Sequence, residues 1–243
     1  MNITNELIQS ADASYKEFHA SLIPTVSKDL VIGVRAPICK KIAKKYAKTK
    51  EGEEFMDTLP HKYHDENMVH GYMLSFLDFD MARKRLEAFL PHMNSWAIVD
   101  STVSALKSFF KHASELKPFI HSLLKSDKEY AVRFGIVALM SYYLDSNAQE
   151  SISLVKGICS DKFYIKMAQA WFFATALTKH YEMALPVIEG RELEPWVHNK
   201  AIQKARESYR VPTDSKRYLN NLKIIDVKKS LKSGKTVLWE EFK

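Results

Sequence analysis

The chain has 243 residues, 46% hydrophobic and 27% charged, a composition that is ordinary for a globular protein and excludes a largely disordered one. Seven glycines are few for this length, so we expect an all-α chain with short connections and no large sheet. Lys and Arg outnumber Asp and Glu by 36 to 29, a net charge of +7, and this excess slightly favours a polyanionic partner.

Two features favour a reducing, cytoplasmic location. Cys39 and Cys159 lie far apart, form no CxxC pair, and are expected to be reduced and buried. The N-terminus lacks a basic segment followed by an apolar run, and about eighteen consecutive apolar residues occur nowhere. We therefore expect neither secretion nor a membrane span.

The first elements are two helices. Apolar residues recur at helical intervals over residues 3–22, which predicts one amphipathic helix that ends before Pro24. Pro37 suits the first turn of a second helix that continues to about residue 46. Its polar side carries Lys40 and Lys41 with two further lysines, which form either a solvated face or a patch that contacts phosphates.

A repeat organises the middle of the chain. The stretch that begins at Asn94 recurs at offsets of 33, 34 and 33 residues, and a weaker copy lies 33 residues upstream. Repeats of this length are typical of stacked helix pairs. First helices are predicted near residues 81–91, 115–125, 148–158 and 180–189, and second helices near 95–111, 128–144, 162–178 and 195–209. A last helix near 214–223 ends a single domain, residues 1–225, and 226–243 form a basic C-terminal tail.

The repeat register places several polar and aromatic residues on equivalent turns of successive second helices. Asp100, Arg133 and Lys200 share one row, and Trp171 and Lys204 share the row one turn further along. If the pairs stack as a solenoid, both rows cross one surface. We therefore expect these five residues to share a concavity.

Asp100 is the acidic residue of its row, and Trp96 lies four residues earlier, on the same helix face. A carboxylate between the indoles of Trp96 and Trp171 suits the stabilisation of a cationic centre. The alternative is structural: the indoles fill the core, and Asp100 caps a helix or pairs with Arg133. Spacing alone leaves both interpretations open.

A family resemblance adds to this interpretation. Ile32-Gly-Val-Arg-Ala-Pro37, the motif from Trp96 to Asp100-Ser101, Arg133 before a small apolar run, and Trp171 together resemble the bacterial AlkD-type DNA alkylation repair family over roughly residues 5–210. The resemblance implies a curved array of HEAT-like helix pairs. It also implies a DNA glycosylase that removes purines alkylated at N3 or N7, whose glycosidic bond is weakened by the positive charge on the base.

The resemblance also implies roles for individual residues. Asp100 would be the catalytic carboxylate, Trp96 and Trp171 would be aromatic walls against the sugar-phosphate at the lesion, and Arg133 would contact the nearby DNA backbone. Further basic residues would hold phosphates irrespective of sequence, and the candidates are Lys200, Lys204, Arg206, Lys40 and Lys41. The implied partner is duplex DNA that carries the lesion, and we expect a monomer to bind it in the concave face.

No metal or organic cofactor is expected. His61, His64 and His70 lie close together in the sequence, but no matched ligand set accompanies them, so we expect ordinary surface or partly buried histidines.

One position departs from the family pattern. The family's best-matching enzymes bring an aromatic residue toward the DNA from the segment before the glycine-containing motif, where this chain has Ser21-Leu-Ile-Pro-Thr25. The departure keeps a second hypothesis open: a non-catalytic member that binds damaged or branched DNA through the same basic concavity. A protein-interaction scaffold is a third.

Overall fold

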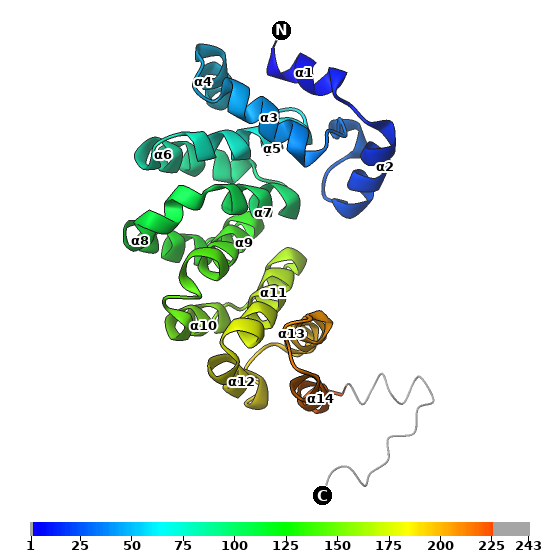
Figure 1. Cartoon of the computed structure of the whole chain (residues 1–243), viewed down its shortest axis with the longest axis vertical. Helices are drawn as coiled ribbons and strands as arrows, with labels where there is room; N and C mark the ends of the chain where they lie inside the picture. Colours follow the sequence, from blue (N-terminus) through cyan, green and yellow to red (C-terminus); the bar gives the residue numbers. More distant parts are fainter. Residues whose placement is uncertain (1, 226–243) are drawn as a thin grey trace, which may run out of the picture.

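The computed structural model describes residues 2–225, and within them the regular structure is helical, without strands. The helices stack as a curved, HEAT-like α-α solenoid with two layers (Figure 1). We call the layer in which each helix packs on the next the inner layer: α3 (Ala36–Tyr46), α5 (His64–Met73), α7 (Trp96–Ala105), α9 (Glu129–Ala138), α11 (Phe163–Lys179) and α13 (Pro195–Glu207).

The outer layer covers the other side of these helices (Figure 1). It consists of α4 (Lys50–Asp57), α6 (Phe79–Phe89), α8 (Ala113–Leu124), α10 (Ala148–Lys156) and α12 (Tyr181–Glu189). The N-terminal helices α1 (Ile3–Gln9) and α2 (Ala13–Leu22) begin the array, and α14 (Thr213–Asn221) ends it. The predicted basic tail, residues 226–243, lies outside the described residues.

The predicted repeat is confirmed: α7, α9, α11 and α13 begin within a residue of the expected second helices, and α6, α8, α10 and α12 match the first ones closely. The single helix expected over residues 3–22 is wrong. The chain breaks after α1, and the Asp12 side chain accepts a hydrogen bond from the Tyr15 backbone N–H at 3.0 Å. A carboxylate at this position satisfies a free N–H group of the first turn, so Asp12 starts a separate helix α2.

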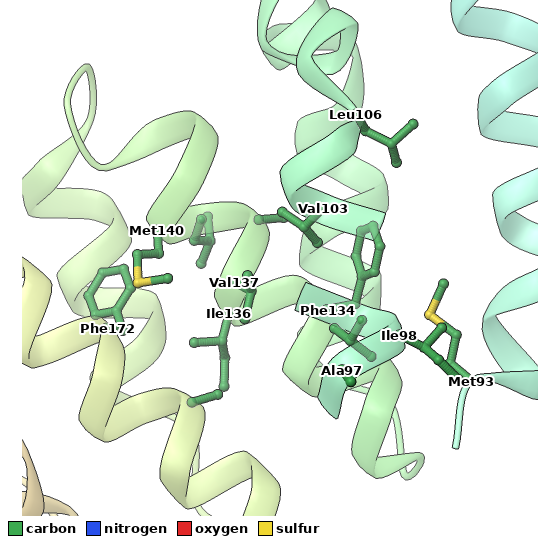
Figure 2. Close-up of a cluster of buried hydrophobic side chains, with 14 of the residues drawn as sticks. Met93, Ala97, Ile98, Val103, Leu106, Phe134, Ile136, Val137, Met140 and Phe172 are labelled. Carbon is green, nitrogen blue, oxygen red and sulfur yellow. The ribbon is translucent and has the colours of Figure 1, made fainter. Parts of the chain in front are cut away.

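The core lies between the two layers and is continuous from pair to pair. Figure 2 shows part of it, where Val103 of α7 and Phe134 of α9 lie together and Met140 lies beside Phe172 of α11. The two phenylalanines are fully buried. No helix pair could bury such a face alone, so each repeat depends on its neighbours for stability.

The Ile32–Pro37 motif is a buried turn. The Asp65 carboxylate, 2% exposed, accepts hydrogen bonds from the backbone N–H groups of Ile32, Gly33 and Val34 at 2.7, 3.2 and 2.7 Å. Gly33 has φ +94°, and a Cβ there would lie 2.6 Å from the Lys16 Cβ. Glycine is therefore required by both backbone conformation and space. The motif fixes the start of the solenoid.

The two cysteines differ. Cys39 is buried, as expected, whereas Cys159 is exposed, and the expectation of burial is wrong for it. Residue 159 lies in the connection between α10 and α11, and connections run over the surface. Among the described helices, none is long and apolar enough to span a membrane.

Candidate functional site

Asp100 and Arg133 form an ion pair between neighbouring inner helices. Arg133 Nε donates to Asp100 Oδ1 at 2.9 Å, and Nη2 donates to Oδ2 at 2.7 Å. The third nitrogen, Nη1, donates to the Tyr164 carbonyl at 3.0 Å, which ties the pair to α11. The side chains are 6% and 17% exposed for Arg133 and Asp100. A bidentate, largely buried pair fixes the orientation of the carboxylate.

Two opposing effects act on this carboxyl. Burial raises the pKa of Asp100 above its ordinary value, and the hydrogen bonds and charge of Arg133 act in the opposite direction. A guanidinium stays charged at any physiological pH, so it favours the ionised carboxylate beside it. Each carboxylate oxygen keeps a further lone pair that can accept a hydrogen bond or face a cation.

A cavity of about 570 Å³ opens at this pair. Asp100 and Arg133 line it together with Trp96, Trp171 and Tyr164. The Trp96 ring is held by a hydrogen bond from its Nε1 to the Leu22 carbonyl at 2.8 Å, and the Trp171 side chain is 37% exposed. The cavity thus combines one carboxylate with two accessible indoles, a set that can stabilise positive charge by Coulombic attraction and by the ring quadrupoles.

The last turn of α2 and the residues that follow it form one wall of the cavity. Ser21, Leu22 and Pro24 line the cavity. Thr25 Oγ1 donates to the Asn94 carbonyl at 2.9 Å, and the Tyr130 hydroxyl donates to Thr25 Oγ1 at 3.1 Å. These contacts link residues 69 and 105 positions apart. In the sequence, Pro24 signals a helix end but carries no information about the contacts that follow it.

Two further hollows adjoin the same surface, and Trp171 lines both of them as well as the cavity. One, of about 680 Å³, is also lined by Asp100, Lys107 and Lys179. The other, of about 380 Å³, is also lined by Lys204 and Arg210. A row of hollows with basic side chains therefore extends from the Asp100 cavity along the inner layer.

The expected concavity holds four of its five residues. Asp100, Arg133, Trp171 and Lys204 line the one cavity. Lys200 instead borders a separate hollow of about 440 Å³, where its Nζ lies 5.8 Å from the Trp196 ring centre.

The remaining basic candidates lie on the surface. Arg206 and Lys41 are exposed and form no hydrogen bond or ion pair within residues 2–225. Lys40 is exposed on α3, with its Nζ 5.2 Å from the Tyr72 ring centre. Arg133 is largely buried, with its guanidinium against Asp100 and Tyr164, and it also lines the cavity.

The N-terminal histidines are packing residues. His64 and His70 are buried, and His61 stacks on Phe55 with ring centres 4.2 Å apart. His61 Nε2 and His70 Nδ1 lie 2.8 Å apart and share a hydrogen bond. Within residues 2–225, no group of three or more His, Cys, Asp or Glu side chains is placed to hold a metal ion.

Comparison with known proteins finds one family model that matches most of the chain. The family model described as "DNA alkylation repair enzyme" matches residues 3–204, from α1 into α13. The matched range includes the whole Asp100–Arg133 pair and both indoles of the cavity. No curated protein matches the chain.

Proposed function

Because the chain belongs to the family of DNA alkylation repair enzymes, we propose that it hydrolyses the N-glycosidic bond of purines alkylated at N3 or N7 in duplex DNA. The observation that carries the proposal is the Asp100 carboxylate, held by Arg133 beside two accessible indoles. This arrangement suits a reaction in which positive charge develops on a sugar.

The proposed reaction begins with a base that already carries positive charge. The bond from C1′ to the purine nitrogen breaks, its electron pair leaves with the base, and the alkylpurine departs neutral. The positive charge passes to the deoxyribose as an oxocarbenium ion. Water then adds to C1′ and loses a proton, which leaves an abasic site. A neutral leaving group needs no acid, so the cavity needs no proton donor to the base.

Four residues of the cavity have a part in this reaction. Asp100 stabilises the oxocarbenium ion by its charge and orients the attacking water through its free lone pairs. Trp96 and Trp171 present ring faces to the cationic sugar. Arg133 is a positioning residue, since its hydrogen bonds to both Asp100 oxygens fix the carboxylate.

The wider surface would hold the duplex. Lys204 lines two of the hollows, and its side chain has neither an ion pair nor a hydrogen bond within residues 2–225. With Lys200, Arg206, Lys40 and Lys41 it would contact phosphates irrespective of sequence, and binding should weaken steeply with salt. We propose that a monomer binds the duplex in this way.

The test is release of free base from a duplex that contains N7-methylguanine. The native chain should release it, and Asp100→Asn should not, while both bind the duplex. Asp57→Asn is a matched control, because Asp57 accepts hydrogen bonds from Arg85 in another aspartate–arginine pair, distant from the cavity and more exposed. Asp57→Asn should release base at the native rate. Equal release by the Asp100 variant would refute the assigned role.

A second function has one observation in its favour. Both Asp100 oxygens already accept hydrogen bonds from Arg133, as in a purely structural ion pair. A non-catalytic member that binds damaged or branched DNA would use the same surface. It predicts salt-dependent duplex binding by the native chain with no base release at any lesion.

A further inference from the structure

Phe163 is an unusually exposed aromatic residue at the rim of the Asp100 cavity. It is the first residue of α11, it lines the cavity, and its side chain is 54% exposed. Its ring packs edge-on against two neighbours, with ring centres 5.1 Å from Tyr164 and 5.8 Å from Trp196. These neighbours fix the ring from the side and leave much of its surface open.

The aromatic surface continues beyond Phe163. Tyr130 and Tyr164 have ring centres 5.8 Å apart, so four rings follow one another across the first turns of α9, α11 and α13. We call Tyr130, Tyr164, Phe163 and Trp196 the aromatic strip. It starts at Tyr130, whose hydroxyl donates to Thr25, and ends at Trp196, which lines the hollow that Lys200 borders.

Positive charge flanks the far end of the strip. The Lys166 and Lys200 Nζ atoms lie 5.3 and 5.8 Å from the Trp196 ring centre. Lys166 also pairs with Glu194 at 3.3 Å, whereas the Lys200 Nζ donates to the Gln203 amide oxygen at 2.8 Å. An open ring face beside ammonium groups is the combination with which proteins hold a nucleotide: the base stacks and the phosphate meets the cation.

We propose that the aromatic strip binds a nucleobase that has left the duplex stack, with Phe163 as its stacking face. The inference rests on the proposed function, since the DNA backbone must lie at Asp100 for a base to reach Phe163. Stacking suits any base, because every base has a π-face. The base comes from the lesion strand, next to the damaged nucleotide, or from the position opposite it.

The test uses photochemical cross-linking of 5-iodouracil, which couples to an aromatic side chain on which it is stacked. The native protein is bound to duplexes with a tetrahydrofuran abasic-site analogue. Iodouracil is placed opposite the analogue in one duplex, beside it in the same strand in a second, and in a fully paired duplex in a third. Mass spectrometry should find the cross-link at Phe163 or Trp196 in one of the first two duplexes and not in the third.

Variants at the stacking face sharpen the result. Phe163→Leu should remove the cross-link and weaken binding of the abasic duplex about tenfold, with little effect on the fully paired duplex. Phe163→Trp should keep both the cross-link and the native affinity for the abasic duplex. The matched control is Met183→Ala, which removes an exposed apolar side chain from α12 in the outer layer. This variant should change neither the cross-link nor the affinity for the abasic duplex.

The outcomes separate the two proposals. Tight binding of the abasic duplexes without any cross-link to the strip would overturn this inference and leave the proposed function standing. An equal cross-link in the fully paired duplex would also overturn it, because the base would not have left the stack. Base release from N7-methylguanine duplexes is measured in parallel, and its absence counts against the proposed function alone.

Discussion

Arg133 contacts both carboxylate oxygens of Asp100 across one structural repeat, since the two residues are 33 positions apart on neighbouring inner helices. The repeat therefore does more than build the scaffold: it places a cation of one helix pair at the carboxylate of the preceding pair. Removal of the cation should leave a largely buried charge without a partner.

Arg133→Met tests this dependence. We expect the free energy of unfolding to fall by about 3 kcal/mol, because methionine fills much of the same side-chain volume but leaves the buried Asp100 carboxylate without a cationic partner. The pKa of Asp100 should rise further, since burial already raises it and the opposing hydrogen bonds are lost. Urea unfolding of Arg133→Met, Asp100→Asn and the double variant measures the coupling. If the loss of stability in the double variant equals the sum of the two single losses, Asp100 and Arg133 do not stabilise the fold as a pair.

A second test compares two basic residues of α13, Lys204 and Arg206, for their contribution to DNA binding. Lys204→Ala should weaken duplex binding and lower the slope of log affinity against log salt by about one, because its side chain lines the Asp100 cavity. Arg206→Ala lowers the net charge by the same one unit but removes an exposed side chain that lines none of the three hollows along the inner layer, and its effect should be smaller. Fluorescence anisotropy at several salt concentrations measures both slopes. Equal losses would mean that only the total charge matters.

Gly33 gives a third prediction, on stability. Gly33→Ala should lower the free energy of unfolding by more than about 1 kcal/mol, because φ is +94° and the added Cβ would lie 2.6 Å from the Lys16 Cβ. Gly157→Ala is the control: its φ is −72°, and its Cβ would approach nothing closer than 3.6 Å. The second variant should be neutral or slightly stabilising. Thermal or urea unfolding compares them.

Acid should destabilise the N-terminal half. Burial lowers the pKa of His61 to about 4 and that of His64 to about 3, and it lowers the pKa of His70 well below its ordinary 6.5. Well above pH 6.5 these histidines are neutral in both the folded and the unfolded chain, so they do not lower the free energy of unfolding. As pH falls from 6.5 toward these lower values, the unfolded chain binds protons and the folded chain does not. Each histidine should therefore lower the free energy of unfolding by about 1–2 kcal/mol near pH 5.

His64→Leu checks that prediction. Both ring nitrogens of His64 are buried without a hydrogen-bond partner in the described chain, so an apolar replacement leaves no unsatisfied group. The variant should lose less stability than the native chain between pH 7 and about pH 5 in urea unfolding. An unchanged pH dependence would remove His64 from the explanation.

The sequence predicted the helix pairs well because packing imposes a period. Each inner helix must bury the same face against its neighbours, so buried residues such as Val103 and Ile136 recur at the repeat spacing, which can be read directly. Asp100 and Arg133 were placed together for the same reason. Lys200 was misplaced because a solenoid rotates from pair to pair, and equivalent positions drift out of one line.

Other features left no periodic signal. The break between α1 and α2 depends on one capping carboxylate, Asp12, in a stretch whose apolar pattern continues across it. The wall from Ser21 to Thr25 depends on contacts with Asn94 and Tyr130. Such pairings between distant segments cannot be recognised in one sequence. For Arg133, spacing left the pair with Asp100 as one of two interpretations, and the structure shows that pair as largely buried.

The Thr25–Tyr130 contact has a consequence for the order of folding. A solenoid is an assembly of local contacts, and such arrays can form from several starting points and grow by addition of neighbours. Thr25 and Tyr130 are 105 positions apart, so their contact is non-local. Closing so long a loop costs entropy that only an already folded stretch α3–α9 can reduce. The wall of the cavity should therefore be among the last parts to form, so a newly made chain acquires its scaffold before its site.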